Sequence, residues 1–287
     1  MKKSIILVLI YFAMQFAAMA LAYGVGMVYF YASGEDNVDY RIMAELMITP
    51  TLVLGFIFMG IYLWRAGYLK PAKELWNMLT PAHWGWTALL GAALIFILDT
   101  LMGLLDFLPD MMEDTFEAIE NGWVGILGIA VLGPILEEML FRGAITRELQ
   151  KHYSEIVTII LSGLIFGLFH INPAQVIPAM FIGFLLAWLY VKTKSLIPGI
   201  IVHIMNNSLS CYFSAAYPEA TNVTDILNFP VILLGLVLSL GLGYLAFKKL
   251  QELFDAEPAE TLEVAVADDE KPSESLEAPT SDGKIDL

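Results

Sequence analysis

The chain has 287 residues, 58% of them hydrophobic, and its mean hydropathy is +0.69. Its apolar stretches of about twenty residues are long enough to cross roughly 30 Å of hydrocarbon and lack a water-facing side, which excludes a large soluble domain. The single cysteine, Cys211, excludes an internal disulfide framework and a cysteine-based metal cluster. The formal net charge is −15, and no nucleic-acid partner is expected.

These stretches predict an all-α fold, a polytopic membrane helix bundle with about eight transmembrane helices. In chain order the predicted helices cover approximately residues 5–31, 43–63, 86–108, 123–143, 156–171, 176–191, 196–213 and 229–247.

The N-terminal part of the chain contains two further signals. Ala18-Met19-Ala20 resembles a signal-peptidase site, but the apolar run continues well beyond it and is longer than the ~7–15 residues of a signal core, which favours a transmembrane helix. Residues 71–83 predict a short interfacial helix, because Trp76, Trp84 and Trp86 are typical of headgroup depth.

Charges in the loops orient the predicted helices. With both termini in the cytoplasm, 14 of the 15 Lys and Arg residues fall on the cytoplasmic side, and only Arg41 falls outside. This bias predicts an integral protein of a bacterial cytoplasmic membrane with cytoplasmic N and C termini.

The C-terminal tail is strongly acidic. From Glu252 to Leu287 it carries −10 of the formal charge, and it is rich in Glu, Asp, Ala, Ser and Pro. A segment of this composition cannot bury enough apolar surface to fold, so residues 251–287 are predicted to be a disordered acidic tail.

Two carboxylates and an arginine interrupt the fourth apolar segment. Each charge at the centre of a bilayer costs roughly 2.5–3.5 kcal/mol in insertion free energy, so three charged side chains together need a reason to be buried there. Glu138 and Arg142 are four residues apart and share a helix face, whereas Glu137 points about 100° away and is free for another partner. A structural explanation is an ion pair at a helix end, with Arg142 reaching towards the cytoplasm. It leaves the second carboxylate unexplained.

Two more polar pairs follow at helical spacing. His170 lies one turn after Phe166, and His203 shares a face with Asn207. Each pair alone could be a hydrogen-bonded contact between helices. A buried glutamate, two histidines and an asparagine together indicate a reactive site.

The ordered pattern resembles that of a known family. Glu137-Glu138-x-x-x-Arg142, Phe166-x-x-x-His170 and His203-x-x-x-Asn207 are similar to the three motifs of the CPBP (Abi) family of intramembrane endopeptidases, which includes CAAX-processing proteases and bacteriocin-immunity proteins. The resemblance covers about residues 122–214. It implies that residues 121–250 form the catalytic domain. The predicted N-terminal part, residues 1–120 with three helices, and the predicted tail, 251–287, lie outside the resemblance.

The resemblance also implies a glutamate-dependent mechanism without a cofactor. Glu137 would be the general base, His170 its partner in holding a water molecule, and His203 and Asn207 the donors to the oxyanion. Glu138, Arg142 and Phe166 would support this site. The substrate would be a peptide or a membrane protein, with a lipidated C-terminus as one option, and the bilayer is the other expected partner.

Two alternatives stay open at this point. Glu137, His170 and His203 match the ligand set of a catalytic zinc site, although the ligands would come from three helices. A non-proteolytic transporter or immunity protein is the other alternative, because Asp99 is a further acid within a predicted span that the motifs do not explain.

Overall fold

The computed structural model describes the chain except for residues 35–39, 71, 78, 106 and 257–287. Every regular element in this part of the chain is helical, and η1 and η2 are π-helical segments. In order the elements are α1 (Lys2–Ala32), α2 (Tyr40–Arg65), α3 (Ala72–Leu75), α4 (Pro81–Met102), α5 (Glu113–Glu120), α6 (Trp123–Leu127), η1 (Gly128–Leu132), α7 (Gly133–Leu140), η2 (Phe141–Thr146), α8 (Arg147–Gln150), α9 (Glu155–Phe169), α10 (Pro173–Thr193), α11 (Ile197–Ala216), α12 (Val223–Ile226) and α13 (Phe229–Ala256).

Six helices in the described residues are long and apolar enough to cross a membrane, two fewer than predicted. They are α1, α2 from Ile42, α4, the continuous run from α6 to α8, α10 and α13. The difference lies in α9 and α11. With 15 residues, α9 spans only about 22 Å at ~1.5 Å per residue. The helix α11 has 20 residues, but polar side chains such as Asn206 and Asn207 lower its hydropathy.

Proline lies in the first turn of several helices. Pro81, Pro173 and Pro198 stand in the first turns of α4, α10 and α11, where the missing N–H has no helical partner to lose.

The predicted interfacial helix is reduced to the four residues of α3, because Trp84 and Trp86 belong to α4.

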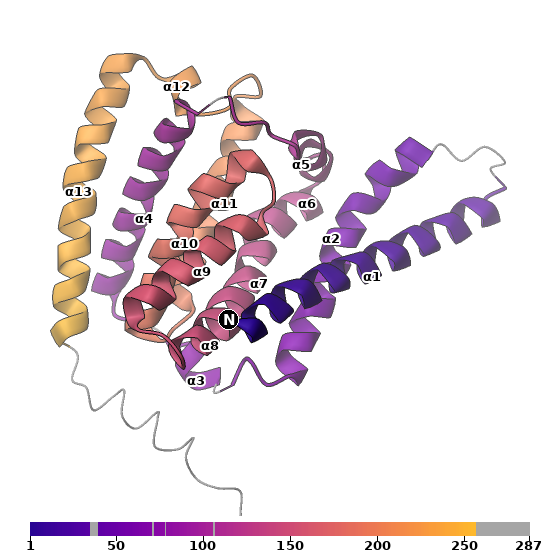
Figure 1. Ribbon diagram of the computed structural model, residues 1–287. Helices are drawn as coiled ribbons and strands as arrows, with labels where there is room; N and C mark the ends of the chain where they lie inside the picture. Colours follow the sequence, from indigo (N-terminus) through magenta and orange to yellow (C-terminus); the bar gives the residue numbers. More distant parts are fainter. Residues whose placement is uncertain (35–39, 71, 78, 106, 257–287) are drawn as a thin grey trace, which may run out of the picture. The chain divides into compact units, whose positions relative to one another are not determined.

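The helices that carry the polar motifs lie between two flanking pairs. In Figure 1, α1 and α2 run beside each other on one flank of α9, α10 and α11, and α4 and α13 lie on the other flank. A hydrophobic core joins the first flank to the centre, because Leu7 and Tyr11 of α1 pack with Met59 of α2, Leu140 of α7 and Phe166 of α9. The helix α7 is therefore enclosed by neighbours that are far from it in sequence.

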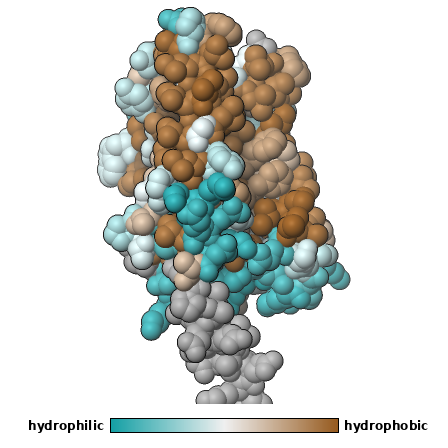
Figure 2. All heavy atoms as spheres, turned by 90° about the vertical axis from the view of Figure 1, so that its left-hand side faces the viewer, coloured by the Kyte–Doolittle hydropathy of each residue, from teal (hydrophilic) through white to brown (hydrophobic). Residues whose placement is uncertain are grey.

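The outer face of α13 is suited to lipid. Figure 2 shows hydrophobic atoms along most of this face and hydrophilic atoms gathered towards one end. Exposed Leu234, Val237 and Leu240 belong to the apolar part, and Lys248 and Lys249 follow in the last turns of the helix.

The end of α13 extends into the predicted tail. Residues 251–256 are helical, and Phe254 stacks on His83 and packs edge-on against Trp188. The remainder of the predicted disordered tail, 257–287, lies outside the described residues.

Candidate active site

The two acidic residues of the first motif sit on α7, a helix of eight residues between the π-helical segments η1 and η2. Such segments occur frequently at functional sites. Pro134 at the start of α7 has no backbone N–H, so the local hydrogen-bond ladder is interrupted one turn before Glu137. Glu138 is fully buried, whereas the side chain of Glu137 is 15% exposed.

The predicted pair of Glu138 and Arg142 forms, but not at a helix end. Arg142 Nη1 donates to Glu138 Oε1 at 3.0 Å, and both side chains are 0% exposed. Arg142 Nη2 donates to the carbonyl of Gly183 on α10, and the guanidinium carbon lies 4.5 Å from the centre of the Phe166 ring. Arg142 thus connects α10 and α9 to the acidic motif, and it does not reach towards solvent.

His203 of α11 lies between the two carboxylates. Its Nδ1 is 3.0 Å from Glu138 Oε1, and its Nε2 is 3.7 Å from Glu137 Oε2. Glu138 Oε1 already accepts from Arg142, and a carboxylate oxygen is an acceptor, so Nδ1 of His203 donates to it. The close approach of Glu138 depends on Gly199 one turn earlier, where a Cβ would lie 2.7 Å from Glu138 Oε2.

The second motif is organised by Phe166, which is 1% exposed. Its ring makes edge contacts with the imidazoles of His170 and His203, with centroids 4.9 and 5.5 Å apart. His170 Nδ1 lies 2.8 Å from the carbonyl of Phe166. Because a carbonyl only accepts, Nδ1 carries the hydrogen, and in the neutral ring Nε2 keeps its lone pair.

Asn207 has a partner that the sequence analysis did not foresee. Its Nδ2 donates to the carbonyl of Ile129 in η1 at 2.9 Å. In a π-helix this carbonyl would accept from residue 134, and Pro134 has no hydrogen to donate. The asparagine therefore satisfies a carbonyl left free by the proline, and it ties α11 to the segment before Glu137.

The structure brings the three motifs together around Phe166 and the two glutamates. Glu137, Glu138 and His203 are joined by the distances above, and the charges of Glu137 and His203 act on the His170 ring. Asn207 contacts no carboxylate among the described residues. Its partner is the backbone carbonyl of Ile129 in η1, the segment that precedes α7.

Tyr11 is a neighbour of the site that sequence reasoning missed. It comes from α1, is 8% exposed, and packs edge-on against Phe169 with ring centroids 4.7 Å apart. Its hydroxyl interacts with the side chain of Gln15 and lies within the electrostatic influence of Glu137. From the sequence alone, a tyrosine in the apolar first helix that lies near the site cannot be distinguished from one that faces lipid.

The zinc alternative finds no support in the geometry. Among the described residues, no group of three or more His, Cys, Asp or Glu side chains is arranged to hold a metal ion. The acid and imidazole that are hydrogen-bonded to each other are Glu138 and His203.

Asp99, the acid that the motifs left unexplained, has a structural role. Its Oδ2 accepts from the backbone N–H of Val223 at 2.6 Å, at the start of α12. It thereby anchors the connection between α11 and α13 to the end of α4. Asp99 is therefore accounted for without an ion pathway.

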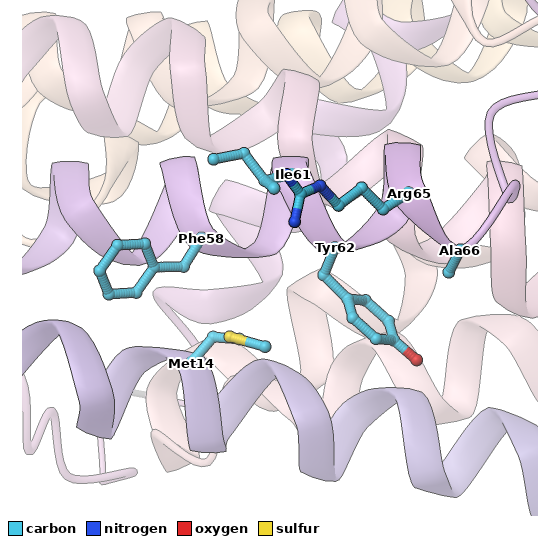
Figure 3. A pocket seen from close by; sticks show the side chains of 6 residues that line it. All are labelled: Met14, Phe58, Ile61, Tyr62, Arg65 and Ala66. Carbon is cyan, nitrogen blue, oxygen red and sulfur yellow. The ribbon is translucent and has the colours of Figure 1, made fainter.

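A pocket of about 490 Å³ lies elsewhere, on α1 and α2 (Figure 3). It is apolar apart from Tyr62 and Arg65, and none of the predicted site residues lines it. The charged groups that can perform chemistry are those around α7, so we assign the candidate site there.

Comparison with known proteins gives a consistent result. Residues 119–209 match the family described as Type II CAAX prenyl endopeptidase Rce1-like. The chain is 35% identical over 112 residues to the Membrane-embedded CAAX protease MroQ of Staphylococcus aureus (strain USA300), a match that covers 36% of this chain and 45% of MroQ. It is 26% identical over 158 residues to UPF0177 protein YxdF of Lactococcus lactis subsp. lactis (strain IL1403), covering 53% of this chain and 86% of YxdF.

No solved structure matches the chain. The match to MroQ spans less than half the length of that protein. The matched segment 119–209 nevertheless contains all three predicted motifs, from Glu137 to Asn207. The segment 119–209 of this chain therefore belongs to the Rce1-like type II CAAX prenyl endopeptidase family.

Proposed function

We propose that the protein is an intramembrane endopeptidase in which Glu137 activates a water molecule for attack on a peptide bond. The observation that carries this proposal is the setting of Glu137 Oε2. This oxygen is buried, receives no hydrogen bond from the described residues, and lies 3.7 Å from His203 Nε2. The separation is too long for a direct hydrogen bond, and one water molecule can contact both groups.

Glu137 is the general base in this mechanism. Its carboxylate takes a proton from the water as the oxygen attacks the carbonyl carbon, and it returns a proton to the leaving amine. His170 helps to hold the water, because the hydrogen bond from its Nδ1 to Phe166 leaves the lone pair of Nε2 free to accept.

His203 and Asn207 stabilise the developing oxyanion. With Nδ1 of His203 donating to Glu138, Nε2 faces Glu137 and is a donor when the ring is doubly protonated. Asn207 uses one amide hydrogen on the carbonyl of Ile129, and the second is available. One good donor of this kind contributes about 2.7–4 kcal/mol to the transition state.

The substrate we propose is a peptide or membrane-protein segment that reaches a site enclosed by membrane helices. The family description and the name of MroQ favour a C-terminal segment that carries a prenyl group. An even number of spans, such as the six candidates, places both termini on one side, and the loop charges favour the cytoplasm for that side.

Loss of this activity is expected to leave uncut substrates in the membrane. We expect Glu137→Ala cells to accumulate protein termini that wild-type cells lack, measured by mass spectrometry of terminal peptides from isolated membranes. The matched control is Glu117→Ala, since Glu117 is an exposed acid on α5.

The membranes of Glu117→Ala cells should resemble wild type. Membranes of Glu137→Ala cells with the same termini as wild type, at equal protein levels, would instead support an immunity or transport role without proteolysis.

A further inference from the structure

The turn between α9 and α10 is tied to a loop 62 residues earlier in the chain. Asn172 Nδ2 donates to Asp110 Oδ1 at 2.9 Å, and Asn172 Oδ1 accepts from the backbone N–H of Met111 at 3.0 Å. Asp110 Oδ1 also accepts from the backbone N–H of Met112 at 2.8 Å. Asn172 is 2% exposed, so these bonds, and not water, satisfy its amide.

These bonds replace a local one that the position of Asn172 favours. Asn172 is the N-cap of α10, where an asparagine oxygen ordinarily accepts from a backbone N–H of the first helical turn. Here the side chain makes no cap hydrogen bond, and the N–H groups of Gln175 and Val176 bond to the backbone carbonyl of Asn172 instead. The side chain is thus committed to the contact with Asp110.

The residue between His170 and Asn172 is strained. Ile171 has a φ of +61°, in the left-handed region that β-branched residues rarely adopt. Its side chain is 67% exposed, so packing of that side chain does not hold the backbone there. Such a conformation persists only where neighbouring contacts enforce it. A backbone bond from the N–H of Asn172 to the carbonyl of His170, at 2.6 Å, closes the turn across Ile171. The side-chain contacts that hold its two ends are the bond from His170 to Phe166 and the bonds from Asn172 to the 110–112 loop.

We propose that Asp110 is a positioning residue for His170. Through Asn172 it holds the strained turn, and the turn keeps the imidazole against Phe166 and within the influence of Glu137. Asp110 lies outside the segment 119–209 that matches the family. The inference rests on the function proposed for His170.

The test observes the His170 ring directly, so it does not depend on cleavage. The chain has four histidines, and in full-length protein with 13C-labelled histidine their ring signals can be assigned with single His→Gln variants. Asp110→Ala is expected to shift the His170 signal and to leave those of His83 and His152 in place. Asp110→Asn keeps the accepting oxygen and should restore the wild-type position. Asp114→Ala, at an exposed acid nearby, is the control.

A second variant guards against misfolding of the first. Asn172→Ser keeps a favourable N-cap and loses the reach to Asp110, so it should shift the same His170 signal. With a peptide that the wild type cleaves, both variants should lower kcat about 10-fold or more at little change in KM, because displacement of a catalytic group acts on the chemical step. An unshifted His170 signal in folded Asp110→Ala or Asn172→Ser would overturn the proposal. So would equal shifts of all four histidines.

Discussion

Glutamine in place of Glu137 is expected to lower the rate constant of peptide cleavage about 10²–10⁴-fold, the range of a lost general base. The amide has nearly the same shape as the carboxylate but cannot accept a proton from water. The fold should tolerate the change, because Oε2 of Glu137 receives no hydrogen bond from the described residues. Single-turnover cleavage by purified protein, together with its thermal unfolding midpoint, measures both effects.

Glu117→Gln provides the comparison for this variant, because it makes the same chemical change on an exposed helix. It should retain the wild-type rate. If Glu137→Gln cleaves the peptide within threefold of wild type, Glu137 is not the base and the proposed mechanism fails.

Methionine in place of Arg142 is expected to reduce the free energy of unfolding by roughly 3–5 kcal/mol, as in other proteins where one partner of a buried ion pair is removed. Glu138 would remain fully buried without its cationic partner, and of its two donors at 3.0 Å it would keep only His203. The carbonyl of Gly183 and the face of Phe166 would lose their contacts as well. Denaturant or thermal unfolding in a defined detergent measures the loss.

The double variant Glu138→Gln with Arg142→Met separates the ion pair from general packing. Neutralising both partners removes the uncompensated charge, so the double variant should be more stable than Arg142→Met alone. If the losses in unfolding free energy of Glu138→Gln and Arg142→Met add up to that of the double variant, the two side chains do not stabilise each other. The ion pair would then not support the site.

Part of this site follows from the sequence because it depends on helical spacing alone. The pairing of Glu138 with Arg142 needs only a separation of four residues on one helix. The partners from other helices could not be predicted in this way. The helical spacing of the residues in α7 and η2 does not indicate that Arg142 contacts the carbonyl of Gly183. Nor does it indicate that Glu138 contacts His203.

The contact of Asn207 depends on a backbone detail that residue patterns do not reveal. Pro134 signals a weakened helix, but the free carbonyl is that of Ile129 only because the preceding segment is π-helical. The role of Asp110 is hidden for a similar reason. An asparagine before a proline predicts a helix cap, and the actual bond runs to a distant loop.

The structure has fewer candidate spans than predicted for a physical reason. Composition identifies α9 and α11 as apolar segments within the bundle, and each contributes to a motif. Because His203 and Asn207 lie on α11, the same residues that form the site make this helix more polar. The shortness of α9 ends that helix beside His170, where the strained turn begins.

The central claim is that water, activated by Glu137, attacks the peptide bond without a covalent intermediate. It is tested most directly by single-turnover cleavage in H₂¹⁸O, with the protein in excess over a synthetic peptide copied from a terminus that accumulates in Glu137→Ala membranes. The account predicts that every newly formed carboxyl terminus carries one ¹⁸O atom. A substantial share of unlabelled product would mean that a protein carboxylate supplied the oxygen, and a peptide left intact by the wild type would contradict the proposed activity itself.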